Sequence, residues 1–90
     1  MFVALTAHDK PGALPIRQEN RPAHLDYIKS SALVAQAGPL LDGEGAMIGS
    51  LIILDVEEMA QAETFAANDP YAKAGLFASV TLQHWNRVIG

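Results

Sequence analysis

The fold of this chain is set by its most apolar stretch, which reads IGSLIILDV over residues 48–56. β-Branched and leucine side chains fill most of its positions, which is typical of a strand. Successive side chains of a strand point to opposite faces, and both sets are apolar here: Ile48, Ile52 and Leu54 on one face, Leu51 and Ile53 on the other. We therefore expect this strand to be covered on both faces.

Two shorter strands are predicted upstream. Residues 2–6 form an apolar run that ends before a turn, and residues 34–37 form a second run that stops at Gly38-Pro39. The composition of Asp42-Gly43-Glu44-Gly45 is typical of a hairpin turn. This turn joins the run at residues 34–37 to the long strand as an antiparallel pair.

The polar segment between those two upstream strands predicts a helix. Its apolar residues Leu25, Ile28 and Ala32 are spaced to share one helical face. Pro22 removes one helical hydrogen bond. We therefore expect Pro22 to kink the helix or to begin a new segment capped by Asn20.

Downstream of the long strand, the sequence predicts a second helix and a last strand. Asp55 is a suitable N-cap, and Glu58 three residues later completes a capping-box pattern. Asn68 can end this helix, and residues 69–75 then form a short turn or helical segment that a glycine terminates. Residues 76–85 alternate between apolar and polar, which indicates a half-buried strand.

The order strand, helix, strand, strand, helix, strand is the ferredoxin-like, or split βαβ, pattern. It predicts one α+β domain over residues 1–90, with a four-stranded antiparallel sheet and both helices on one face. The other face would then be bare, although the long strand is apolar on both sides. Since large exposed apolar patches are uncommon, we expect a homodimer that packs sheet against sheet, the alternative being a monomer with a partly exposed sheet.

Composition limits the classes of function. The 90 residues include six basic and ten acidic side chains, which gives a net charge of −4, and no cysteine. An acidic chain lacks the clustered cations that nucleic acid requires, and without cysteine there is no disulfide or thiolate metal site. No stretch approaches the roughly 20 apolar residues of a membrane helix. We expect no nucleic-acid or membrane partner and a cytoplasmic location.

His24 is the histidine whose surroundings favour a catalytic role. On a helix Arg17, Arg21 and His24 fall at i, i+4 and i+7, and Ile28 continues this stripe. The nearby cations favour the neutral imidazole, which is the form that acts as a base. The alternative is a histidine that only covers the rim of the core.

Asp69, Tyr71 and Ser50 are further candidates. Asp69 can cap the turn that begins at Pro70, which is a structural role, or it can orient an imidazole. Tyr71 offers a phenol as a donor or weak acid, and Ser50 faces out of its strand toward a ligand. No HxxxH, HxH or HExxH spacing, phosphate-binding loop or serine nucleophile elbow is present, so we expect no metal ligands.

Motifs along nearly the whole chain resemble those of the YCII-related (YciI-like) proteins of the dimeric α+β barrel superfamily. The resemblance rests on Arg21-Pro22-Ala23-His24-Leu25, Ala37-Gly38-Pro39-Leu40, Gly49-Ser50 and the run from Asn68 to Leu76. It implies a ferredoxin-like fold paired into a dimer, with a cleft between helix and sheet. It also implies a catalytic pair of His24 and Asp69.

Related members act on small ring compounds without a metal or organic cofactor. Examples are the dehydrochlorination of a chlorinated hydroxyhydroquinone and, in the wider superfamily, the isomerisation of muconolactone. The resemblance therefore implies a cofactor-free lyase or isomerase in which His24 and Asp69 are catalytic. From the residues themselves we expect Arg17, Arg21, Ser50 and Tyr71 to bind the substrate. The alternative is a non-catalytic module that binds a small molecule or serves as an accessory subunit.

Overall fold

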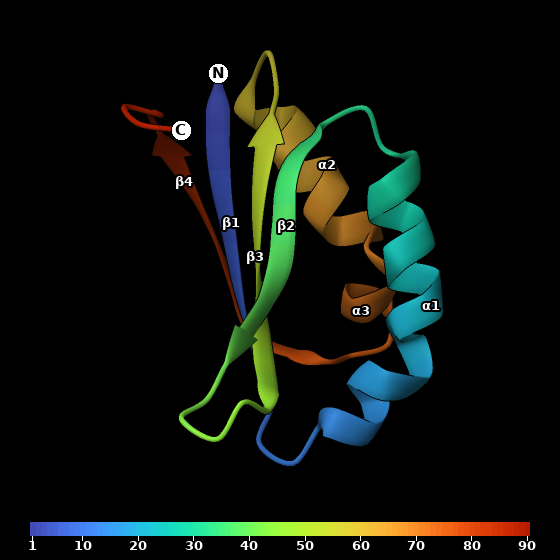
Figure 1. Ribbon diagram of the computed structural model, residues 1–90. Coiled ribbons are helices and arrows are strands. Elements are labelled where there is room, and N and C mark those ends of the chain that lie inside the picture. The colour runs from blue at the N-terminus through green and yellow to red at the C-terminus, as the bar shows by residue number, and fades with distance from the viewer.

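One antiparallel sheet and a layer of helices make up the computed structural model, which describes residues 1–90 (Figure 1). The elements follow in this order: β1 (Phe2–Asp9), α1 (Leu14–Ser30), β2 (Val34–Leu41), β3 (Met47–Asp55), α2 (Met59–Asn68), α3 (Pro70–Lys73) and β4 (Phe77–Trp85). The prediction of a ferredoxin-like α+β fold is confirmed, with α3 as the short helical segment before Gly75.

The sheet has the strand order β2-β3-β1-β4, and all neighbouring strands are antiparallel. The two central strands pair with Leu5 opposite Ile52, and Leu5 also lies opposite Leu82 of β4. Directly opposed residues share a face of the sheet. Val3, Leu5, Ile52 and Leu54 therefore face the helices, and they are almost fully buried against Phe65 and Ala62 of α2.

The helices cover one face of the sheet and leave the other open (Figure 1). We call this uncovered side the outer face. Register places Phe2, Leu51, Ile53 and Trp85 on it. Leu51 is 40% exposed and Trp85 is 39% exposed. The expected two-sided apolar character of β3 is therefore present. On its outer side Leu51 stays partly exposed, whereas Ile53 is only 7% exposed.

Two local expectations change, and a third is decided between its alternatives. β2 runs through Gly38 and Pro39 to Leu41, because an edge strand tolerates a proline that donates no ladder hydrogen bond. Of the two outcomes expected at Pro22, the kinked helix fits the structure: Pro22 lies inside the single helix α1, whose first turns lie at an angle to the rest in Figure 1, and no new segment begins there.

The N-cap of α2 is also different from the expected one. Glu58 takes this place, in a capping box with Gln61, while Asp55 still belongs to β3. Val56 is 3% exposed and packs in the core, so the chain turns into the helix only after it. None of the helices is long and apolar enough to cross a bilayer.

Candidate functional site

A cavity of about 170 Å³ lies where α1 faces β2, β3 and α3. Its lining includes five of the six residues singled out from the sequence: Arg17, Arg21, His24, Ser50 and Tyr71. Ala37, Gly38 and Pro39 of β2 form the wall opposite α1. The sixth residue, Asp69, lies behind His24, within hydrogen-bond distance of its ring.

Helical spacing and strand alternation bring these side chains together. Arg17, Arg21 and His24 lie on one stripe of α1, as the i, i+4, i+7 pattern predicted. Ser50 lies two residues before Ile52 on β3 and shares its inward face, which points at that stripe. Tyr71 comes from α3, which packs beside α1.

A short polar contact at the cavity joins His24 and Asp69. His24 Nδ1 lies 2.8 Å from Asp69 Oδ1, and the residues are only 6% and 1% exposed. Nε2 of His24 has no hydrogen-bond partner in the protein. Because every fully buried side-chain nitrogen or oxygen of the chain does have a partner, Nε2 is not fully buried and a ligand can reach it. Because His24 lines the cavity, Nε2 is the ring atom available to a ligand there.

Asp69 also has the structural role that the sequence allowed. Its Oδ1 accepts a hydrogen bond from the backbone N–H of Tyr71 at 2.9 Å, which caps the short helix α3. One carboxylate therefore fixes both the start of α3 and the imidazole of His24. The two interpretations of Asp69 are compatible, because the cap holds the carboxylate rigidly beside the ring.

Arg17 is held by a partner that the sequence did not reveal. Its Nε and Nη2 donate to the two oxygens of Asp9 at 2.7 and 2.8 Å, and Nη2 also donates to Ser50 Oγ at 2.9 Å. Burial alone would lower the pKa of Arg17, but the hydrogen bonds and charge of Asp9 outweigh it and the pKa is raised. The guanidinium therefore stays charged although its side chain is 2% exposed.

A local irregularity of the sheet accompanies Asp9. The register between β1 and β4 shifts between His8 and Asp9, and such bulges are common next to functional sites. The only sequence signal was an acidic residue at the end of a strand, with a cation eight residues later on the next helix. That spacing has no fixed meaning, so the pair becomes visible only in three dimensions.

Tyr71 lies between Arg17 and His24 of the stripe. Its ring stacks on His24 with centroids 4.0 Å apart, and Arg17 Cζ lies 4.6 Å from its centroid. Seven residues of helix separate Arg17 from His24 by roughly 10 Å along the axis, so they contact Tyr71 from two sides. Burial raises the pKa of Tyr71, although Arg17 and Arg21 oppose this effect, so the phenol is protonated at neutral pH.

Arg21 is the cation of the cavity lining that has no carboxylate partner. Asp9 neutralises the charge of Arg17, whereas no carboxylate lies within ion-pair distance of Arg21. Arg21 is also exposed to solvent. A charge at the rim of a small, partly enclosed cavity attracts ligands of opposite sign. The site is therefore electrostatically suited to an anion or to a group that becomes negative.

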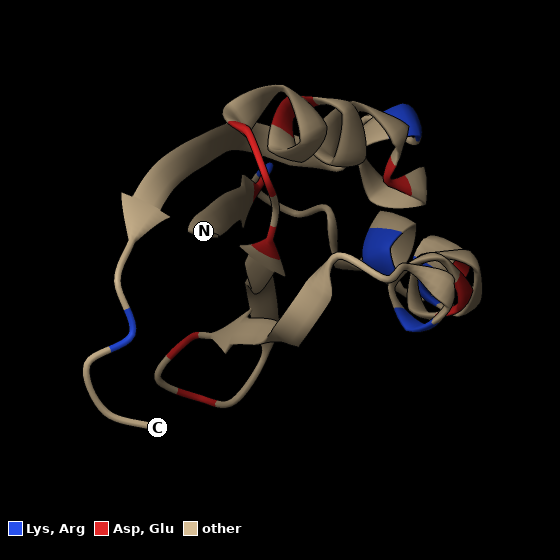
Figure 2. Cartoon of the chain, turned by 90° about the horizontal axis from the view of Figure 1, so that it is seen from above, with Lys and Arg blue, Asp and Glu red and all other residues tan.

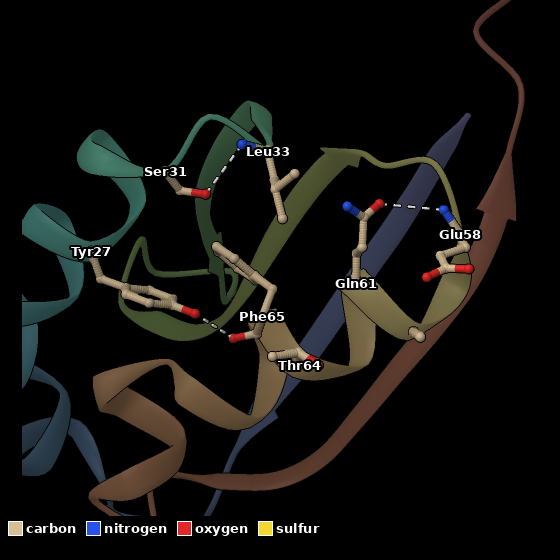
Figure 3. Close-up of a pocket in the computed structure, with 8 residues that line it drawn as sticks. Tyr27, Ser31, Leu33, Glu58, Gln61, Thr64 and Phe65 are labelled. Carbon is tan, nitrogen blue, oxygen red and sulfur yellow. Dashed lines mark hydrogen bonds between the residues drawn. The ribbon is translucent and has the colours of Figure 1, made fainter.

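A larger cavity, of about 400 Å³, lies between the end of α1 and α2 (Figure 3). Most of its polar side chains already have structural partners. Tyr27 Oη donates to the Phe65 carbonyl, and Gln61 and Glu58 form the capping box of α2. We therefore place the candidate site in the smaller cavity, where reactive groups converge. No group of three or more His, Cys, Asp or Glu side chains is arranged to hold a metal ion.

Comparison with known sequences gives a consistent picture. Residues 1–86 match the family of the YCII-related domain. An uncharacterized protein of Haemophilus influenzae is 31% identical over 97 residues, which cover 98% of this chain and 99% of the relative. Protein YciI of Escherichia coli is 30% identical, with the same coverage of both chains.

Solved structures extend the comparison. The fold matches that of 5-chloro-2-hydroxyhydroquinone dehydrochlorinase from Burkholderia phenoliruptrix AC1100, solved as a complex with 2,5-dihydroxybenzoquinone. The TM-score is 0.89 at 34% identity, over 96% of this chain and 94% of that one. PA3566 from Pseudomonas aeruginosa gives a TM-score of 0.59 at 14% identity, over 98% and 93% of the two chains, and shows the shared fold alone.

Proposed function

Since this chain belongs to the YCII-related domain family, we propose that it is a cofactor-free lyase or isomerase that moves a proton on a small ring compound. The observation that carries this proposal is the His24–Asp69 pair, 2.8 Å apart, with Nε2 accessible at the cavity. A general base must reach its proton directly and be held in the correct tautomer. Asp69 accepts Nδ1–H, which leaves the lone pair of Nε2 for the substrate.

The cations of the cavity complete the chemistry. When Nε2 removes a proton, the electron pair left behind moves onto an oxygen of the ring compound. Arg17 and Arg21, which both line the cavity, stabilise that negative oxygen. The cycle closes when His24 returns the proton to another atom, as in an isomerase. In a lyase an anion leaves the ring instead, and His24 then releases its proton to water.

The related dehydrochlorinase supports the class of substrate. That enzyme acts on 5-chloro-2-hydroxyhydroquinone and was solved with 2,5-dihydroxybenzoquinone bound. Hydroxylated six-membered rings carry acidic protons and oxygens that become negative, which matches a base beside two cations. We propose the same class of ring compound for the cavity next to His24.

Turnover of a panel of hydroquinones, hydroxybenzoquinones and lactones tests this proposal. We expect His24→Gln, which keeps the size of the side chain, to lower kcat by about 10²–10⁴-fold. Asp69→Asn retains an oxygen to cap α3 but not the charge, and we expect it to lower kcat as well. His84→Gln, in an exposed histidine of β4, is the matched control and should leave kcat unchanged.

The same panel separates catalysis from simple binding. Compounds that bind the folded state raise its melting temperature by mass action. If compounds stabilise the wild type through His24 but none is converted, the chain is a small-molecule-binding module and the catalytic proposal is wrong. Full turnover by His24→Gln would also refute it.

We further propose that the chain forms a homodimer through the outer face. Leu51, Trp85 and their apolar neighbours leave this face without cover in one chain. Burial of apolar surface is the main driving force of such association. Sedimentation equilibrium should give twice the 9.6 kDa mass of the chain, and Leu51→Asp should shift the distribution to monomers. A wild type that is monomeric at high micromolar concentration would refute the proposal.

A further inference from the structure

The segment after β4 carries the most exposed apolar side chains of the molecule. Val88 is 83% exposed and Ile89 is 90% exposed, more than any other large hydrophobic residue. We call residues 86–90 the tail. Two adjacent β-branched side chains in water are unfavourable, and they favour a contact that a single chain does not supply.

The start of the tail is anchored on the outer face. Arg87 Cζ lies 4.7 Å from the centroid of the Phe2 ring, and Trp85 packs edge-on against the same ring at 5.9 Å. Figure 2 shows the chain leaving β4 on the side of the sheet away from the helices. The tail therefore extends from the surface on which a second copy would pack.

A shallow groove of about 190 Å³ lies on the same face at the opposite edge of the sheet. Its lining includes Gln36, Leu40, Leu51 and Ile53, which are mostly apolar. The segment Ala37–Pro39 of β2 lines both this groove and the candidate active site. Whatever fills the groove therefore supports the wall of the active site from behind.

We propose that the groove binds the tail of a second copy, with Val88 and Ile89 as the inserted residues, an inference that rests on the homodimer proposed above. The strand order β2-β3-β1-β4 supplies the geometry. When two such sheets pack face to face about a two-fold axis parallel to the strands, β4 of one copy lies over β2 of the other. Both grooves are then filled by equivalent contacts, as two-fold symmetry requires.

The tail is long enough for this contact. The register places Asp55 of β3 level with Trp85, the last residue of β4. Ile53 lies two residues from Asp55, so Trp85 and the groove are offset by about 7 Å along the strands. Packed sheets are about 10 Å apart, which gives a path of roughly 12 Å. The four residues from Trp85 to Ile89 extend to about 13 Å.

The alternative two-fold axis, perpendicular to the strands, is chemically less suitable. It places β4 of one copy over β4 of the other, so the tail meets the outer face of that strand. Register puts Ser79, Thr81 and Gln83 there, which form a polar row. Val88 and Ile89 gain little from such a surface, whereas Leu51 of the groove, 40% exposed, offers apolar contact.

Disulfide cross-linking tests the inference directly, because the chain contains no cysteine. Each introduced cysteine is then unique. Oxidation of a mixture of Ile89→Cys and Gln36→Cys proteins should give a linked dimer with a 36–89 peptide, since a disulfide forms only when Cα atoms are within about 7 Å. Ile89→Cys mixed with Gln83→Cys is the control, and we expect it to cross-link at least about tenfold more slowly.

Sedimentation of the same proteins separates this inference from the homodimer on which it rests. Dimers that give no 36–89 link, or that link 83–89 as fast, overturn the tail contact and leave the homodimer standing. A monomeric wild type overturns both. As a second measurement, Val88→Ser/Ile89→Ser should raise the dissociation constant of the dimer at least about tenfold, while Val80→Ser, an exposed valine on the helix side of β4, should not.

Discussion

Removal of the Arg17 charge should destabilise the fold strongly, because Asp9 would remain as a buried carboxylate without a partner. The Arg17 and Asp9 side chains are 2% and 6% exposed, and two hydrogen bonds of 2.7 and 2.8 Å join them. Breaking a buried ion pair from one side costs about 3–5 kcal/mol. We expect this loss for Arg17→Met, against a total of about 5–13 kcal/mol for a domain of this size.

Two further variants show whether the loss comes from the unpaired charge. Asp9→Leu combined with Arg17→Met removes both charges, so the double variant should recover at least about 2 kcal/mol relative to the sum of the single losses. Arg17→Lys keeps a positive charge but not the two-pronged contact, and we expect it to lose about 1–2 kcal/mol.

Urea unfolding followed by circular dichroism measures these differences. With a slope of about 1 kcal/mol per molar urea, the midpoint of Arg17→Met should fall by roughly 3–5 M. Single-variant losses below about 1 kcal/mol, or losses that add without coupling in the double variant, would show that Asp9 does not hold Arg17 in solution.

Three further predictions concern the fold and its pH dependence. A methyl group at Gly49 would collide with the backbone oxygen of Ala7, so Gly49→Ala should lose at least about 2 kcal/mol by urea unfolding, whereas Gly43→Ala, with open space around it, should lose little. Because burial raises the pKa of Tyr71 above its ordinary 10.0, the phenol supports stability that is complete below pH 10 and lost as the pH rises through the raised pKa. Tyr71→Phe should flatten the fall in unfolding free energy measured from pH 9 to 11, and an unchanged slope would contradict this. Backbone hydrogen bonds from Ala46 and Glu44 lower the pKa of Asp42 from 3.8, so the stability that its carboxylate contributes is present above pH 3.8 and lost as the pH falls through the lowered pKa. Asp42→Asn should therefore lose less unfolding free energy than the wild type on acidification to pH 2. Equal losses in the two proteins would contradict this.

The long strand and the helical stripe could be predicted from the sequence because each depends on local composition or spacing. The continuous β-branched and apolar run at residues 48–56 predicted β3, and the spacing of Arg17, Arg21 and His24 placed them on one side of α1. Asp69 beside Pro70 was identified as a cap from local sequence alone, and it forms one. Local rules were sufficient where the interaction is itself local.

Contacts between segments that are distant in the sequence could not be predicted in the same way. Asp9 reaches Arg17 because the end of β1 lies under the first turns of α1, and no local pattern encodes that approach. The His24–Asp69 contact spans 45 residues and was suggested by family resemblance rather than by spacing. The N-cap of α2 moved from Asp55 to Glu58 because Val56 packs in the core, which is a tertiary effect.

The tautomer of His24 tests most directly whether this pair works as an oriented base. In a long-range ¹H–¹⁵N NMR spectrum at pH 8, we expect the proton on Nδ1, which donates to Asp69, and an unprotonated Nε2. Asp69→Asn should change this pattern, since the carboxylate that fixes the proton is gone. A wild-type ring that carries its proton on Nε2 would leave no base at the cavity and would contradict the proposed mechanism.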